Sequence, residues 1–144
     1  MWNSVSGRLI LFVLVVVLSS SCSRFRSIQK SEDWKVKYEA AFEYYENEDY
    51  YRSILLFEEI MPVIRAMKEG EKAQFYYAYC HYYQKSYLLS SHYFKTFAQT
   101  YSRSQYAEEA HYMAALSLFN QSPYYNLDQS STIEAVDALQ AHVN

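Results

Sequence analysis

Apolar residues in the middle of the chain follow a helical spacing that is interrupted once. Between residues 71 and 101 they recur at intervals of three or four positions, and Gln84-Lys85-Ser86 breaks the pattern. Such spacing is typical of an amphipathic helix with one face buried. This stretch therefore predicts two helices, 71–83 and 87–100, joined by a tight turn.

The same pattern occurs again at a fixed distance along the chain. Tyr50 precedes Tyr87 by 37 residues (87 − 50 = 37), and Ala41, Ala78 and Ala115 are separated by the same step. Recurrence on this scale indicates an array of helical repeats, and the roughly 34-residue tetratricopeptide unit has the nearest period. The other matched pairs are Ser53 with Ser90, Phe57 with Phe94, and Ile60 with Phe97.

Extending this pattern in both directions gives the predicted fold. Repeats are expected at residues 32–67, 71–101 and 105–144, each built from two helices. The chain has only two glycines and two prolines, and this scarcity of turn residues argues against an all-β fold. The sequence thus predicts an all-α protein, a right-handed solenoid of tetratricopeptide-like repeats.

Single residues are expected to mark the ends of the helices in the first repeat. Ser31 is a plausible cap for a first helix over 32–47. Pro62 should bend or shorten a second helix over 49–67, because proline has no backbone N–H to donate. Gly70 should close the repeat by permitting the turn into the next helix.

The third repeat departs from the pattern of the other two. Its predicted helices, 105–120 and 132–144, are separated by the polar segment 121–131, which is either a partner-binding loop or a tolerated insertion. The last helix keeps apolar residues that no later helix covers. We therefore expect the chain to be the front part of a longer protein, with a partner or a second copy as the alternatives. These apolar residues are Ile133, Val136, Leu139 and Val143.

Residues 1–21 have the layout of a secretory signal peptide. Arg8 precedes the apolar run 9–18, which is too short for a lasting transmembrane helix of about 20 residues. Small residues before Cys22 resemble the lipobox of bacterial lipoproteins. The resemblance implies that Cys22 is acylated and begins a mature chain whose residues 22–31 form a basic tether, either against lipid head groups or solvated. The alternative is an ordinary cleaved signal followed by a chance cysteine.

The residues after Cys22 also bear on where such a lipoprotein would reside. Ser23 is not an aspartate, and no acidic cluster of the kind associated with surface export in Bacteroidetes-like bacteria follows it. This favours the periplasmic face of the outer membrane.

Charge and residue spacing exclude several classes of function. The formal net charge is −3, and an acidic chain is an improbable partner for nucleic acid. The four histidines show no HxxxH or HExxH spacing, and too few glycines are present for a phosphate-binding loop. The adjacent acids Glu58 and Glu59 point apart on a helix. We expect no enzyme activity, no metal and no cofactor other than the lipid on Cys22, and we interpret Cys80 as a buried small hydrophobe.

Large residues occupy positions i, i+4 and i+7 of each predicted first helix and so share one face. The alanines on the neighbouring face are interpreted as the packing seam. In this repeat class the large residues would then line the concave side, as a trough for an extended peptide; the alternative is that they belong to the core. The stripe comprises Tyr38, Phe42 and Tyr45, then Phe75, Tyr79 and Tyr82, then Tyr112, Leu116 and Phe119.

The order of these features resembles one family. A lipobox, tyrosine-rich repeats, SQYAEEA at 104–110, SP at 122–123 and TIEAVDALQ at 132–140 are similar to the BamD family in its Bacteroidetes-like form. These are the tetratricopeptide lipoproteins of the β-barrel assembly machine. The resemblance covers nearly the whole mature chain, with fewer repeats than the family pattern has.

The resemblance implies a lipid-anchored scaffold at the periplasmic face of the outer membrane. Its N-terminal repeats would bind unfolded outer-membrane protein precursors, and its C-terminal repeats would bind the central barrel subunit of the machine. The alternative is another periplasmic tetratricopeptide lipoprotein, one that binds glycans or nutrients or coordinates the cell envelope.

Overall fold

The computed structural model describes residues 24–121 and 129–143. The predicted signal peptide, Cys22 and most of the predicted loop 121–131 lie outside these residues. Every regular element among the described residues is a helix, and no strand occurs among them. The predicted all-α class is therefore confirmed.

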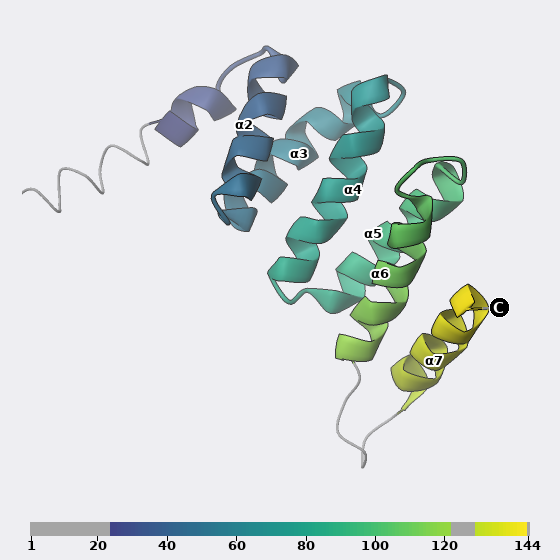
Figure 1. Ribbon diagram of the computed structural model, residues 1–144. Coiled ribbons are helices and arrows are strands. Elements are labelled where there is room, and N and C mark those ends of the chain that lie inside the picture. The colour runs from purple at the N-terminus through teal and green to yellow at the C-terminus, as the bar shows by residue number, and fades with distance from the viewer. Residues whose placement is uncertain (1–23, 122–128, 144) are drawn as a thin grey trace, which may run out of the picture.

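Six long helices follow one another across Figure 1, from α2 on the left to α7 on the right. Each packs against the next helix along the chain, so that they form three successive hairpins, α2–α3, α4–α5 and α6–α7. The helices are α2 Trp34–Glu46, α3 Tyr50–Ile64, α4 Lys68–Tyr83, α5 Tyr87–Thr100, α6 Ala107–Gln121 and α7 Ser130–Val143.

The core consists of two clusters that share residues at their boundary. One is built mainly from α2, α3 and α4, and the other from α4, α5 and α6. Tyr76 and Tyr93 pack against both clusters. The hairpins are thus joined by continuous side-chain packing.

The predicted limits of the helices hold at some ends and shift at others. Helix α5 has the predicted limits, but the prediction that Ser31 caps the first helix is wrong. The cap is Asp33, whose Oδ1 accepts a hydrogen bond from the Lys35 amide at 2.9 Å. Ser31 instead accepts one from the Asp33 amide at 3.2 Å, so it holds the capping residue in place.

Pro62 lies in the last turn of α3, which ends at Ile64 rather than at Met67. This agrees with the predicted shortening. Gly70 has a different role from the one predicted. It does not adopt a positive φ, and it lies inside the first turn of α4. A Cβ at this position would stand 2.3 Å from the Ile64 carbonyl oxygen. Gly70 is therefore needed for close backbone contact between α3 and α4.

The turns within the first two hairpins have the same hydrogen bonds, 37 residues apart. In the first, the Glu48 amide donates to the Tyr45 carbonyl at 3.0 Å; in the second, the Lys85 amide donates to the Tyr82 carbonyl at 2.9 Å. Glu48 and Lys85 both have φ of 61°, a conformation that is uncommon for residues other than glycine. The sequence repeat is thus also a repeat of backbone geometry.

Buried polar side chains repeat with the same step. The Ser53 hydroxyl donates to the Ala41 carbonyl at 2.9 Å, and the Ser90 hydroxyl donates to the Ala78 carbonyl at 3.2 Å. The Cys80 thiol donates to the Ser53 hydroxyl at 3.3 Å. These contacts tie the two helices of each hairpin together and link the first hairpin to the second.

Residues 24–29 form a short helix in place of the solvated linker considered from the sequence. Phe25 and Ile28 pack against the first core cluster. Arg24 makes a salt bridge of 2.7 Å with Glu43 of α2. The part of the tether described by the structure is therefore packed on the first hairpin.

None of the helices among the described residues has the length and apolar character needed to cross a membrane.

The substitution Gly70→Ala tests the close contact between α3 and α4. Because the added Cβ would collide with the Ile64 carbonyl, we expect the free energy of unfolding to fall by about 1–3 kcal/mol. Urea unfolding measures this change, with Lys68→Ala at the exposed start of α4 as the control. A gain of about 1 kcal/mol, the usual effect of replacing glycine by alanine inside a helix, would show that the contact is not restrictive.

Candidate peptide-binding surface

The predicted aromatic stripe of α2 faces the second hairpin. The rings of Phe42 and Tyr45 meet the ring of Tyr76 on α4, with centroids 5.2 and 4.9 Å apart. The Lys72 ammonium of α4 lies over the Phe42 ring, 4.6 Å from its centroid. Most of this stripe thus lies in the contact between consecutive hairpins, which we call the inter-hairpin seam.

The stripe of α4 forms an equivalent seam with the third hairpin. Phe75 stacks on Tyr106, just before α6, with ring centroids 4.6 Å apart. The Tyr79 hydroxyl donates to Glu109, and the Tyr82 hydroxyl accepts a hydrogen bond of 3.1 Å from Asn120. The first two copies of the stripe therefore hold the hairpins together.

The nine stripe residues differ in how much surface they leave for a ligand. Phe75 is only 3% exposed and belongs to the core, so the alternative interpretation of the stripe is correct for this residue. Phe119 is 56% exposed and Tyr112 is 43% exposed. The half-buried residues are Tyr38, Phe42, Tyr45, Tyr79, Tyr82 and Leu116.

The three alanines that recur every 37 residues pack inside their own hairpins. Ala41, Ala78 and Ala115 are completely buried. The carbonyls of Ala41 and Ala78 accept hydrogen bonds from serines on the second helix of the same hairpin. The alanines thus permit close packing within hairpins, and the aromatic stripe provides packing between them.

Two tyrosines of the seam were not among the predicted residues. Tyr76 lies between Phe42 and Tyr45, as described above. Tyr83 stacks on Tyr50 with ring centroids 4.8 Å apart, and its side chain is 46% exposed. Each directly follows a stripe residue in the sequence. The sequence could have indicated them because the apolar face of α4 is wider than the predicted stripe.

A hollow of about 340 Å³ lies beside the start of the first seam. Tyr38 of α2 and Tyr106 provide its rings, and residues from the first turns of α4 provide charges of both signs. A second hollow of about 500 Å³ shares Glu71 and Gln105 with the first. We call them the paired hollows. The remaining residues lining the first are Lys68, Glu69 and Lys72, and those lining the second are Thr100, Tyr101, Ser102, Arg103 and Ser104.

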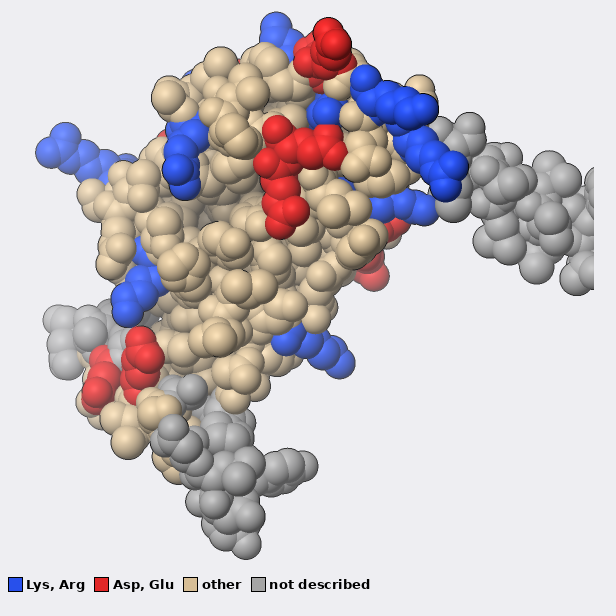
Figure 2. Space-filling view, turned by 180° about the vertical axis from the view of Figure 1, so that it is seen from behind, with Lys and Arg blue, Asp and Glu red and all other residues tan. Residues whose placement is uncertain are grey.

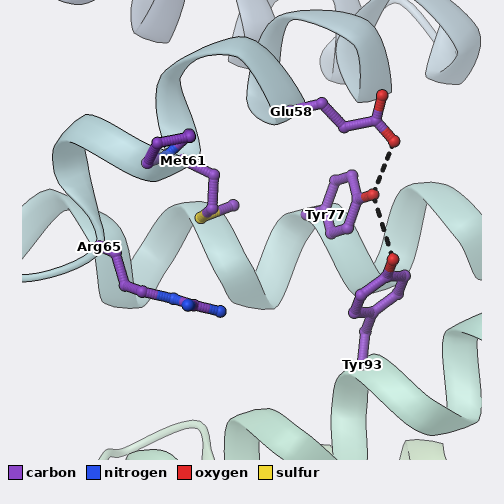
Figure 3. A pocket seen from close by; sticks show the side chains of 6 residues that line it. Glu58, Met61, Arg65, Tyr77 and Tyr93 are labelled. Carbon is purple, nitrogen blue, oxygen red and sulfur yellow. Dashed lines mark hydrogen bonds between the residues drawn. The ribbon is translucent and has the colours of Figure 1, made fainter.

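Another pocket of about 340 Å³ lies between α3, α4 and α5 (Figure 3). The Tyr77 hydroxyl donates to Glu58 at 2.8 Å and lies 3.5 Å from the Tyr93 hydroxyl. Burial is the main cause that raises the pKa of Tyr77, and these hydrogen bonds raise it further. The phenol therefore stays protonated. Arg65 lies at the opposite end from Glu58, with Met61 between them. The pocket suits an apolar group with polar ends, and its volume is at the lower end of the range of ligand sites.

His81 packs against the two tyrosines that line this pocket. Its ring stacks on Tyr93, with centroids 5.0 Å apart, and meets the edge of Tyr77 at 4.7 Å. Burial lowers the pKa of His81, although Glu58 acts in the opposite direction. Its Nε2 is buried with no hydrogen-bond partner among the described residues. A neutral ring that fills space explains this arrangement.

Charged side chains do not gather into a patch of one sign on the face seen in Figure 2. Small groups of lysines and arginines and small groups of acids both occur on this face, with a broad uncharged area between them. The described part of this face therefore lacks the continuous basic surface that nucleic-acid binding uses. Among the described residues, no group of three or more histidines, cysteines or acids is placed to hold a metal ion.

Cys80 should be inert toward thiol reagents in the folded protein. Burial raises the pKa of its thiol to about 12, so the reactive thiolate is scarce at neutral pH. We expect iodoacetamide at pH 8 to modify Cys80 only when urea unfolds the chain, as measured by mass spectrometry of the peptide containing it. Rapid labelling without denaturant would show that the seam between the first two hairpins opens readily.

The chain matches no protein-family model and no curated protein sequence.

Proposed function

We propose that this chain is a non-catalytic scaffold at the periplasmic face of the outer membrane, anchored by a lipid on Cys22. It binds unfolded β-barrel precursors and subunits of the machine that inserts them. Its hairpins form a right-handed solenoid of tetratricopeptide-like repeats. The observation that carries this proposal is the inter-hairpin seam. Equivalent residues form it between the first and second hairpins and between the second and third, and it holds the hairpins together so that their outer surfaces can bind partners.

The register of the seam supports the solenoid. Lys72 meets Phe42 and Glu109 meets Tyr79, each across a separation of 30 residues (72 − 42 = 30; 109 − 79 = 30). The two contacts differ in kind but join equivalent positions (42 + 37 = 79; 72 + 37 = 109), which supports a similar placement of each hairpin on the previous one. Repetition of one such operation generates a superhelix.

The paired hollows are the surface that best suits an extended peptide. The first offers the rings of Tyr38 and Tyr106 beside lysines and glutamates, and the second offers mainly polar groups. Successive side chains of an extended segment point to opposite sides. A barrel strand, in which aromatic or aliphatic residues alternate with polar ones, could place its apolar side chains on the rings and its polar ones toward the charges.

The assignment to the outer membrane depends on the sequence before the described residues. The lipobox-like order around Cys22, the tyrosine-rich repeats and the motifs that resemble the BamD family support it together. The short helix 24–29 packs against the first hairpin, which would hold the array close to its anchor. The most direct test is affinity purification from outer membranes, in which barrel subunits and precursors should be recovered with the chain.

The lipid anchor can be tested with Cys22→Ser. Without the thiol no acyl chains can be attached, and the bilayer affinity of about 0.8 kcal/mol for each buried CH₂ is lost. We expect the variant to move from the membrane fraction to the soluble periplasmic fraction and to lose incorporation of labelled palmitate. Cys80→Ser, which leaves the anchor intact, should remain in the membrane. Unchanged membrane retention and labelling of Cys22→Ser would contradict the anchor.

The peptide site can be tested with Tyr38→Ala. Loss of an aromatic anchor should weaken binding of a peptide with alternating aromatic and polar residues about tenfold or more, as measured by fluorescence anisotropy. Tyr51→Ala, which removes a ring that is 64% exposed on α3, is the matched control. Equal affinities of the two variants would exclude the paired hollows as the peptide site. Circular dichroism would show whether Tyr38→Ala remains folded.

A further inference from the structure

We infer that the pocket between α3, α4 and α5 binds the carboxyl-terminal lysine of a partner peptide. The lysine ammonium would bind at Glu58 and the terminal carboxylate at Arg65, with the methylene chain between them. The inference rests on this pocket alone and does not depend on the proposed function. We call it the tyrosine pocket, and it is lined by Glu58, Met61, Pro62, Arg65, Tyr77 and Tyr93.

The tyrosine pocket has one charge of each sign, at opposite ends (Figure 3). Glu58 and Arg65 are seven residues apart at the end of α3, so their backbones are separated by about 10 Å along the helix. No described residue forms an ion pair or a hydrogen bond with the Arg65 guanidinium, and no described cation forms an ion pair with Glu58. Two opposite charges that are held apart in this way select a ligand that is itself charged at both ends.

The Glu58 end of the pocket suits a compact hydrogen-bond donor. The Tyr77 hydroxyl donates to one carboxylate oxygen of Glu58 at 2.8 Å, which orients the carboxylate and leaves its other oxygen for a ligand. Tyr93 adds a hydroxyl 3.5 Å from that of Tyr77. An ammonium can donate to separate oxygens in different directions, whereas a guanidinium donates best as a planar fork to both oxygens of one carboxylate. This end therefore favours lysine over arginine.

The walls between the two charges suit the methylene chain of lysine. Met61 lies between Glu58 and Arg65 in Figure 3. The rings of Tyr77 and Tyr93 meet edge to face, with centroids 4.8 Å apart. Aliphatic carbons gain free energy by leaving water, and an ammonium gains more beside an aromatic ring. The pocket volume of about 340 Å³ fits one side chain and its terminal carboxylate better than a large cofactor.

The Arg65 end distinguishes a peptide terminus from a free amino acid. A planar guanidinium matches a carboxylate through two parallel hydrogen bonds. Free lysine carries an α-ammonium beside its carboxylate, and this positive charge would lie close to the guanidinium and be repelled. The amide nitrogen of a peptide is neutral. Arg65 is exposed, so the peptide chain before the lysine can leave the pocket toward solvent.

The tyrosine pocket is not a by-product of the helical repeat. The residues 37 positions before and after Tyr77 are Ala40 and Ala114, which are 5% and 8% exposed. The residue equivalent to Glu58 is Lys95, of opposite charge (58 + 37 = 95). Hairpins therefore pack with alanine where the pocket has Tyr77. All the lining residues come from the first two hairpins, so the pocket is complete within them.

Matched ligands test this inference by NMR titration of the isotope-labelled full chain in a nonionic maltoside detergent. With Nα-acetyl-lysine, we expect saturable shifts of the amide signals of Met61, Tyr77 and Tyr93. Nα-acetyl-lysinamide, which lacks the carboxylate, and Nα-acetyl-norleucine, which lacks the ammonium, should each bind about tenfold more weakly, because each loses a charged hydrogen bond. Free lysine should also bind more weakly than Nα-acetyl-lysine.

Variants of the two charged residues locate the site. Glu58→Gln and Arg65→Gln should each weaken binding of Nα-acetyl-lysine about tenfold. Glu108→Gln and Arg26→Gln, which remove exposed charges elsewhere, should leave the affinity unchanged. Arg65→Glu should invert the selectivity, because a pocket with an acid at each end prefers cadaverine, the diamine of the same chain length. A merely structural role of Arg65 would not produce this gain.

The opposite results would overturn the inference. They are no saturable shifts, equal affinities for the three acetylated ligands, or equal affinities of Arg65→Gln and the unaltered chain. Binding of free lysine as tight as that of Nα-acetyl-lysine would overturn the assignment to a peptide terminus. Glu58 and Arg65 are both exposed, and circular dichroism checks that the variants remain folded. Arg65→Gln should keep the Tyr38-dependent peptide binding proposed above, so the two proposals fail separately.

Discussion

Close contact between successive hairpins is the constraint on which the rest of this structure depends. The second helix of one hairpin packs closely on the first helix of the next, where Cys80 meets Ser53 and Ser117 meets Ser90. Aromatic pairs contribute about 0.5–1.5 kcal/mol each beyond the area they bury. The core is divided into two clusters, each built from more than one hairpin, so the stability of each hairpin depends on its neighbours.

The abundance of tyrosine follows from this constraint. A seam ring is apolar on the faces that pack and lies close to water or to polar groups at its tip, which suits tyrosine better than phenylalanine. Tyr79 and Tyr82 reach Glu109 and Asn120 across the seam. Burial is the main cause that raises the pKa of Tyr45 and Tyr79, so these phenols stay protonated and keep their role as neutral donors. Phe75, whose ring edge is enclosed on all sides, needs no such tip.

Local patterns predicted the helices well, and long-range packing explains what they missed. The 37-residue step correctly identified equivalent positions, because the turns at Glu48 and Lys85 and the bonds from Ser53 and Ser90 to alanine carbonyls lie within single hairpins. The direction in which a helix face points depends on the angle between hairpins, which no single hairpin encodes. The stripe was therefore assigned to an open trough, whereas most of it forms the seam. The role of Gly70 is hidden from the sequence for a similar reason, since it is set by the approach of the Ile64 carbonyl from another helix.

The two ends of the array differ in a way that gives it a direction. At the beginning, Glu39 and Glu43 occupy seam positions, and the helix 24–29 packs beside them with Arg24 on Glu43. At the other end, Phe119 of α6 and Val136 of α7 are 56% and 44% exposed. Charged groups resist burial and apolar groups favour it. Helix α2 thus carries exposed carboxylates at the positions where α4 has Tyr76 and Cys80, and the N-terminal helix pairs one of them, Glu43, with Arg24.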